Sequence, residues 1–257
     1  MKLKQWFAFY VMTFLSTIAM GQFTHEPLPC LQKKFGIIVH VVYDYNGNPN
    51  ITETEIQTKI DGVNAIFDSI CIAFEICEFR YISNYNYDEF SPNEFPLMEA
   101  AYCEANRINL FFTGAVAMGE GYATLGGIDS LSSGGLVAAK TFNSGDIAHL
   151  FGHFFGLYNT WEGSQFANAE LADGSNCASA GDSICDTPAD PFYLLSGFPW
   201  LSLGIPDFIY QGLDANGDYF NPLVGNIMSN YPHRCFFTYG QYRKMVDVWL
   251  SSSQKMW

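Results

Sequence analysis

Apolar and polar residues alternate in blocks along the first half of the chain, and the apolar blocks are short. Each is four to ten residues long and several are rich in Ile and Val, which is typical of buried strands. The block Gly119–Leu125 lies between glycines and is expected at a sheet edge. Strands are predicted over Phe35–Tyr43, Ile72–Tyr81, Ile108–Phe112, Gly119–Leu125 and Gly135–Ala139.

Helical periodicity separates these blocks. It is clearest over Thr52–Ser69, where Ile56, Ile60, Val63 and Phe67 fall on one face and Thr52 with Glu55 forms a capping box. Shorter helices are predicted over Pro96–Cys103 and Thr238–Leu250. Because strands and helices alternate, the sequence predicts a mixed α/β fold.

The segment Tyr158–Gly225 has no such periodicity and is rich in Gly, Asp, Asn and Pro. A stretch of this length without regular structure is usually functional, or held by disulfides and ions. Its Asp214–Asp218 portion begins like a calcium loop, but the twelfth position is Gly225 rather than Glu, so a tight turn is predicted there.

The N-terminus resembles a secretory signal peptide. Lys2 and Lys4 precede the apolar run Trp6–Ile18, and small residues follow it up to Gly21. We expect cleavage of residues 1–21, one domain over residues 22–257, and a secreted or periplasmic protein with no remaining membrane contact. The chain has a formal charge of −14, which argues against a nucleic-acid partner.

Seven cysteines in an exported chain suggest disulfides with at least one cysteine left over. Cys71 and Cys77 flank a predicted strand, so a bond between them would need a bend. The expected bridge joins Cys235 to either Cys177 or Cys185 across the irregular region.

Chemistry concentrates in the helical stretch DIAHLFGHFFGLYNTWE, residues 146–162. His149 and His153 are four residues apart, so both imidazoles fall on one face, as in helices that present two nitrogens to zinc. Gly156 follows where a helix can end. The stretch resembles the metzincin motif H-E-x-x-H-x-x-G-x-x-H.

Further segments extend this resemblance to the pappalysin family of metzincin metallopeptidases. They are AHLFGHFFGLYNTWEG (148–163), ADGSNCASAGDSICDTPADP (172–191) and NIMSNYPHRC (226–235), with FGIIVHVVY and FTYGQYRKM in support. The resemblance implies an upper lobe with a twisted mixed sheet and two long helices. It also implies an irregular lower lobe in which a Met-turn methionine, here Met228, lies beneath the metal.

The family resemblance also implies binding roles. An edge strand including Gly121, Tyr122, Ala123 and Thr124 would hold an extended peptide or protein segment by β-augmentation. Some relatives bind calcium near the stretch that here includes Asp186, Thr187 and Asp190, so calcium is a second expected ion.

Three departures from the family pattern concern catalysis. Leu150 occupies the position of the general-base Glu, and Asn159 occupies the position of the third zinc-binding His. Asn230 stands where many relatives carry a Tyr that steadies the tetrahedral intermediate. Since Leu150 has no proton to exchange, we expect no peptidase activity. Since an amide oxygen suits calcium better than zinc, we expect zinc binding to be weak or lost.

Each remaining group also has a structural explanation. The two imidazoles of the helix can be remnants on a packed face, Met228 can simply fill core space, and His40 in the first strand is expected to be a core residue. His233 is a conceivable replacement ligand, while Asp146 and Glu162 are weak candidates for a substitute base.

Three functions therefore compete. The favoured one is a secreted pseudopeptidase that keeps a peptide-binding cleft. The others are an active zinc endopeptidase with an atypical site, and a structural or cell-surface module. Zinc content and peptide cleavage distinguish the second from the others, and peptide binding without cleavage distinguishes the first from the third.

Overall fold

A five-stranded sheet forms the centre of the protein in a computed structural model, which describes residues 26–119, 121–129, 135–192, 212–231 and 234–252. The sheet order is β2-β1-β4-β7-β6. Four strands run parallel and β6 pairs with β7 in the antiparallel direction, so the sheet is mixed. Its strands are β1 (Lys33–Val42), β2 (Ile72–Ile82), β4 (Ile108–Thr113), β6 (Tyr122–Ala123) and β7 (Gly135–Ala139).

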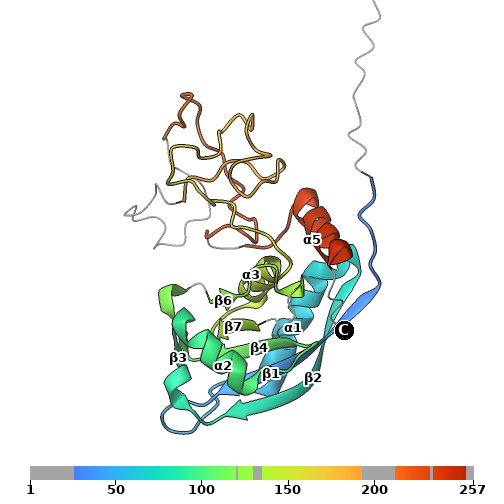
Figure 1. The fold of residues 1–257 in the computed structure, drawn as a ribbon, viewed down its shortest axis with the longest axis vertical. Helices are drawn as coiled ribbons and strands as arrows, with labels where there is room; N and C mark the ends of the chain where they lie inside the picture. The colour runs from blue at the N-terminus through green and yellow to red at the C-terminus, as the bar shows by residue number, and fades with distance from the viewer. Residues whose placement is uncertain (1–25, 120, 130–134, 193–211, 232–233, 253–257) are drawn as a thin grey trace, which may run out of the picture.

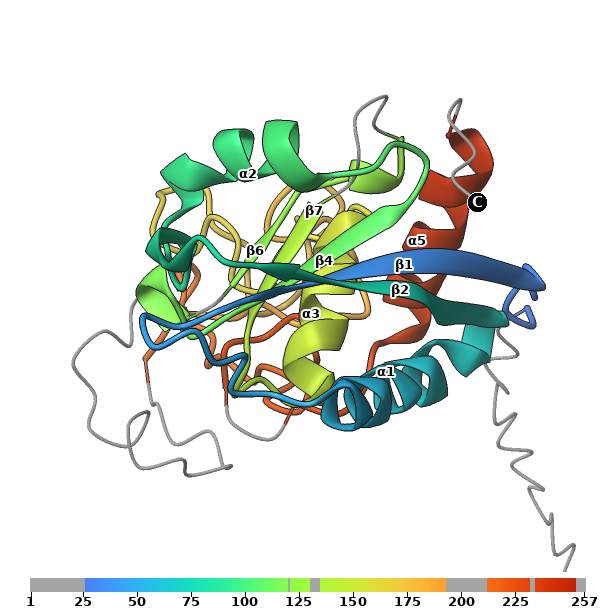
Figure 2. The same cartoon turned by 90° about the horizontal axis from the view of Figure 1, so that it is seen from below.

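Helices cover both faces of this sheet. Figure 2 shows α2 on one face and α1 with α3 on the other, while α5 packs at the end of the sheet. The helices are α1 (Glu53–Phe67), α2 (Phe95–Tyr102), α3 (Ser144–Phe154) and α5 (Tyr239–Ser251). A small second sheet pairs β3 (Glu89–Phe90) with β5 (Ala115–Val116).

Alternation along the strands divides the core into two clusters. Val39 and Val41 of β1 pack with α1 and α3, whereas Phe111 of β4 and Val137 of β7 pack under α2. The first cluster is rich in aromatic rings, with Phe74 and Phe151 only 4.1 Å apart between centroids. Burial of this apolar surface, at about 25 cal/mol per Å², is the main stabilising force of the sheet layer.

The second half of the chain forms a largely irregular lobe, drawn in yellow to orange at the top of Figure 1, with α5 returning to the sheet layer. Turns held by side chains replace helices and strands there. Asp214, for example, accepts hydrogen bonds from the backbone N–H groups of Asn216 (2.8 Å) and Asp218 (2.9 Å), and this is the tight turn predicted from the sequence.

The predicted fold class is confirmed, with one difference at the edge of the sheet. The edge strand expected over Gly119–Leu125 is reduced to Tyr122–Ala123, since positive φ angles at Gly119, Gly121 and Gly126 break the extended backbone. The segment expected to be a signal peptide, residues 1–21, lies outside the described residues. Within those residues, no helix is long and apolar enough to cross a bilayer.

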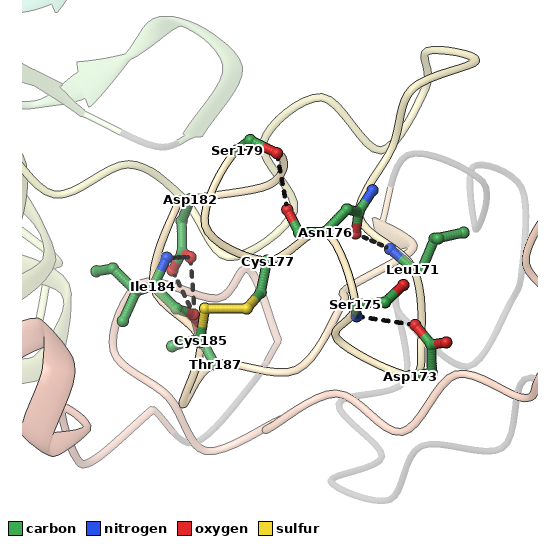
Figure 3. Close-up of a disulfide and its surroundings, with 10 residues drawn as sticks. All are labelled: Leu171, Asp173, Ser175, Asn176, Cys177, Ser179, Asp182, Ile184, Cys185 and Thr187. Atoms are coloured by element: carbon green, nitrogen blue, oxygen red, sulfur yellow. Dashed lines mark hydrogen bonds between the residues drawn. A yellow bond between two sulfur atoms is a disulfide. The ribbon is translucent and has the colours of Figure 1, made fainter.

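The disulfide prediction was wrong. Cys177 pairs with Cys185 within the irregular lobe (Figure 3), Cys30 pairs with Cys71, and Cys235 is an exposed free thiol. Cys177 and Cys185 are 8 positions apart in the sequence, and the turns between them return the chain so that their Cα atoms lie 5.0 Å apart. Because Cys177 and Cys185 bond to each other, neither is available to pair with Cys235.

Candidate metal and peptide-binding cleft

Helix α3 places the two histidines. Asn143 caps its first turn by accepting hydrogen bonds from the N–H groups of Gly145 and Asp146, and Asp146 completes the capping box. Gly156 has φ +85°, a left-handed conformation that ends the helical segment two residues after Phe154. These two signals fix the helix so that His149 and His153 are one turn apart, with ring centroids at 4.7 Å.

Backbone carbonyls orient both imidazoles. Nδ1 of His149 lies 2.7 Å from the carbonyl oxygen of Ile227, and Nδ1 of His153 lies 2.8 Å from that of Leu157. A carbonyl accepts only, so each Nδ1 carries the proton and each Nε2 presents a lone pair. This is the arrangement in which zinc-binding histidines are usually held.

Burial keeps both rings neutral. Desolvation lowers the pKa of His149 well below its ordinary value, helped by the charge of Arg234, and desolvation also lowers the pKa of His153. Arg234 Nη1 lies 3.2 Å from Nδ1 of His149 but donates to the carbonyl of Ser229 at 3.1 Å and pairs with Asp146. Neutral imidazoles are the form that binds a metal.

Asn159 stands beside this pair. Its side chain offsets part of the desolvation that lowers the pKa of His153, and its Oδ1 is buried with no well-aligned hydrogen-bond partner among the described residues. A buried acceptor without a partner is unfavourable and fits a site that takes a cation. The set is nonetheless two nitrogens and one neutral oxygen. Among the described residues, no group of three or more His, Cys, Asp or Glu side chains converges as metal ligands do.

Leu150 lies in the same cleft as the imidazoles. The cleft has a volume of about 330 Å³. Leu150 is 1% exposed, and its Cδ2 lies 3.1 Å from the position that a Cβ on Gly121 would take. The position expected to hold a general base is therefore occupied by an apolar side chain that packs against the edge strand. The lining residues are Gly121, Tyr122, Ala123, Leu125, His149, Leu150, His153, Tyr158 and Glu162.

The two proposed substitute bases differ in position. Asp146 is engaged by Arg234 and by the N–H of Asn143, so its carboxylate is committed to the helix N-terminus. Glu162 instead lines the cleft with an exposed side chain. Sequence periodicity could not place Glu162 there, because the chain leaves the helix at Gly156 and turns before reaching it.

Met228 lies directly beneath α3. It is fully buried, and its Sδ contacts the site where a Cβ on Gly152 would sit, on the turn between the two histidines. Asn226 holds the turn by accepting a hydrogen bond from the N–H of Met228 at 2.8 Å. Asn230 is half-buried in the same turn. His233 lies outside the described residues.

Gly152→Ala tests this close contact. We expect the added methyl group to meet Met228 and lower the free energy of unfolding by about 1–3 kcal/mol, the usual cost of overpacking. Met228→Ala should cost less in the Gly152→Ala background than in the parent protein, because the two changes compensate in volume. Urea unfolding of all four proteins measures this, and additive effects would contradict the contact.

The three residues expected to bind calcium make hydrogen bonds to different parts of the chain. Asp186 caps α5 by accepting from Thr238 Oγ1 and the N–H of Gly240, both at 2.7 Å. Thr187 Oγ1 donates to Asp182 at 2.9 Å (Figure 3). Asp190 accepts at 2.7 Å from the hydroxyls of two residues in other loops, Thr160 and Tyr231.

Two further carboxyl groups, not predicted from the sequence, accompany this segment. Glu170 is 6% exposed and its Oε1 is buried with no hydrogen-bond partner in the described part of the chain, while Asp182 is fully buried. Desolvation raises the pKa of Glu170 to about 8 and that of Asp182 to about 7, and the negative charges of Asp182 and Asp190 add to the shift at Glu170. Only the fold of the irregular lobe brings them together.

Comparisons with known proteins give limited matches. The sequence matches no known family profile and no curated protein. Among solved structures, metalloproteinase-II from Bacteroides fragilis is similar at TM-score 0.34 and 16% identity, covering 53% of this chain and 45% of that one. A structure described as a chaperone–substrate complex matches at TM-score 0.33 and 13% identity, covering 59% and 28%. This chain thus spans less than half of either solved chain.

Proposed function

We propose that the protein is a secreted metallopeptidase-like protein of pappalysin type that binds an extended peptide and does not hydrolyse it. The observation that carries this is the cleft itself: two neutral imidazoles line a volume whose expected proton-transfer position is the buried side chain of Leu150. Without a base, water in the cleft has no partner that takes its proton and passes it to a leaving amine.

Peptide binding is supported by the edge of the sheet. β6 is the last strand, pairs with β7 on one side only, and contributes Tyr122 and Ala123 to the cleft wall. An extended peptide that adds to this edge would gain main-chain hydrogen bonds, and its side chains would reach the cleft. The strand is two residues long, so the affinity must come mainly from side-chain contacts in the cleft.

The experiment that tests this function is a peptide-library capture. The purified protein is incubated with a broad library, and bound peptides and cleavage products are identified by mass spectrometry. We expect enrichment of intact peptides, which is lost when Gly121→Pro disrupts the cleft edge. If the library shows no enrichment and no cleavage, the structural or cell-surface module is favoured. Chelator-sensitive cleavage would favour the active endopeptidase.

We further propose that zinc binds weakly. His149 and His153 would hold it through Nε2, and Asn159 would add only a neutral oxygen. A bound zinc ion supplies Lewis-acid chemistry to peptidases. Calorimetric titration should give weak binding that His149→Ala largely removes. Stoichiometric zinc that survives dialysis against a chelator would contradict this proposal and point to a ligand such as His233.

Calcium is proposed for the acidic group in the irregular lobe. Glu170, with its buried Oε1 free of partners, and Asp182 would provide carboxylate ligands, with Asp190 close enough to add to the field. Asp186 is excluded from this group by its role at α5, and Thr187 already bonds to Asp182. Oxygen ligands of this kind suit calcium.

The calcium-free protein should lose stability as the pH rises. The pKa of Glu170 is raised to about 8 in the fold, so the folded state keeps a proton that the unfolded chain has already lost. This contribution is complete below pH 4.5, the ordinary pKa, and disappears as the pH rises to about 8. Between pH 6.5 and 8 we expect a loss of about 1–2 kcal/mol.

Thermal unfolding in the presence of a chelator measures how the stability depends on pH, and Glu170→Gln should reduce this dependence. Glu94→Gln, which changes a carboxyl group outside this cluster that accepts a hydrogen bond from the N–H of Ser91, serves as the matched control. Calcium should raise the melting temperature more at pH 8 than at pH 6.5. An unchanged slope in Glu170→Gln would contradict the titration, and no calcium effect at pH 8 would contradict the ion site.

A further inference from the structure

A second concave site lies at the end of the sheet where β1 and β2 finish, and it shares no residue with the cleft at α3. Its volume is about 360 Å³. It contains two exposed tyrosines and no cationic lining residue. The lining residues are Tyr45, Tyr85, Asn86, Asp88 and Glu89.

The two tyrosines are unusually accessible for large aromatic side chains. Tyr45 is 79% exposed and Tyr85 is 50% exposed, and their rings meet edge to face at 5.4 Å and 84°. Neither ring belongs to either core cluster. Exposed aromatic pairs of this kind add little to folding, and aromatic residues are enriched where proteins bind partners.

The wall that carries Tyr45 is held in shape by Asp44. Its Oδ1 accepts hydrogen bonds at 2.8 Å from the N–H groups of Asn46 and Asn48, and its Oδ2 accepts one at 2.9 Å from Nδ2 of Asn50. These bonds lower the pKa of Asp44 to about 2, so the loop stays closed across the neutral pH range.

The opposite wall is also fixed. Tyr85 begins a short 3₁₀ turn, Tyr85–Tyr87, which Asp88 follows as the C-cap. The Asp88 carboxylate accepts from Nζ of the buried Lys140 and from the N–H of Gly114, both at 2.7 Å. Because Asp88 is neutralised by Lys140, Glu89 provides the available negative charge. Among the described residues, the side chains of Tyr45, Tyr85, Asn86 and Glu89 have no hydrogen-bond partner.

We propose that this pocket binds a lysine or arginine side chain presented by a protein partner. A cation is attracted by the faces of tyrosine rings and by a carboxylate beside them. The perpendicular rings form a corner that suits a compact charged group, whereas a flat sugar ring stacks best on one open face. The formal charge of −14 adds a field that favours basic partners.

The fixed walls make this binding favourable, because little conformational entropy is lost when the site is filled. The high exposure of Tyr45 leaves the pocket open on one side. An open corner cannot enclose a free ion, so the cation is expected at the end of a side chain whose parent protein covers the opening.

NMR titration tests the proposal. The probes are a capped Ala-Ala-Lys-Ala-Ala peptide, its norleucine counterpart, tetramethylammonium and cellotetraose. We expect the lysine peptide to shift the amide signals of Tyr45, Tyr85 and Glu89, with no shift at Tyr122 in the α3 cleft, and its affinity to fall as salt is added. The norleucine peptide and cellotetraose should leave these signals in place, and tetramethylammonium should bind more weakly than the lysine peptide.

Variants locate the contacts. Glu89→Gln and Tyr45→Leu should each weaken the lysine peptide about two- to five-fold, the range of exposed cation–aromatic contacts. Tyr219→Leu, an exposed tyrosine in the irregular lobe, and Glu75→Gln on β2 are matched controls that should bind as the parent protein does. All four positions are exposed, so circular dichroism should show intact folding.

Several outcomes would overturn the proposal. Equal shifts with the norleucine peptide would show an apolar contact, and shifts with cellotetraose alone would show a sugar site. If tetramethylammonium binds as tightly as the lysine peptide, a protein partner is not needed and the proposal is wrong. If no probe shifts the signals at 50 mM, the pocket is not a binding site. Because the measured signals are those of Tyr45 and Tyr85, these outcomes do not depend on whether the α3 cleft binds peptides.

Discussion

The unaltered protein should leave a broad peptide library intact, even with added zinc. Two independent defects produce this result. Leu150, 1% exposed in the cleft, cannot exchange a proton, and positioned acid–base groups typically contribute about 10²–10⁴-fold in rate. Asn159 offers one neutral oxygen at the position where the proposed family relationship implies a third imidazole, so a metal would be held loosely.

Because the defects act on different steps, only their joint repair should restore hydrolysis. Leu150→Glu supplies a base without a firmly held metal, and Asn159→His supplies a ligand without a base. The double variant should gain at least ~10²-fold over either single variant, the lower bound for a general base. Asn230→Tyr, in the Met228 turn, should add to that gain.

The matched control is Leu125→Glu in the Asn159→His background. Leu125 lines the same cleft and is 47% exposed, so this variant adds a carboxylate that is not on α3. Activity in the control would show that position is unimportant. Chelator-sensitive cleavage by the unaltered protein would end the pseudopeptidase proposal, and a double variant that binds zinc tightly but stays inert would favour a structural module.

Sequence reasoning worked best where local signals decide the structure. The capping box at Thr52 and Glu55 places the start of α1 at Glu53, and Thr238 with Gln241 places the start of α5. The i, i+4 spacing places the two histidine rings side by side, because a helix fixes that relation over a single turn.

Relations between loops were not predictable in the same way. Glu170 meets Asp182 only because turns in the irregular lobe fold back, and Glu162 reaches the cleft because the chain reverses after Gly156. No periodic pattern in the sequence indicates where a loop folds back. A buried carboxyl group also looks like a solvated one in sequence, since its partners are far along the chain.

The disulfide prediction failed for a related reason. It assumed that Cys235 faces the other loop cysteines, as the positions around the site suggested. The turns at Gly181 and Ser183, both with positive φ, instead bring Cys177 and Cys185 together. Cys71 also has positive φ, at the end of the 3₁₀ turn after α1, and this directs its sulfur toward Cys30 rather than along β2 toward Cys77.

Removal of the two disulfides should have unequal effects. In the chain-entropy description, a crosslink stabilises more when it closes a longer loop. Cys30 and Cys71 are 41 residues apart, and Cys177 and Cys185 are 8 apart. We expect Cys30→Ser with Cys71→Ser to lower the free energy of unfolding by about 4 kcal/mol, and Cys177→Ser with Cys185→Ser by about 2.5 kcal/mol.

The Cys30–Cys71 bridge also anchors the start of β1, where the N–H of Leu31 donates to the carbonyl of Ile70 and that of Lys33 to the carbonyl of Cys71, both at 3.0 Å. Loss of the bridge should therefore speed hydrogen exchange at Leu31 and Lys33 while α3 stays protected. Cys235→Ser, which removes an exposed free thiol, is the control and should change stability by less than about 0.5 kcal/mol. Equal losses from the two bridges, or a larger loss at Cys235, would show that the pairing or the entropic reasoning is wrong.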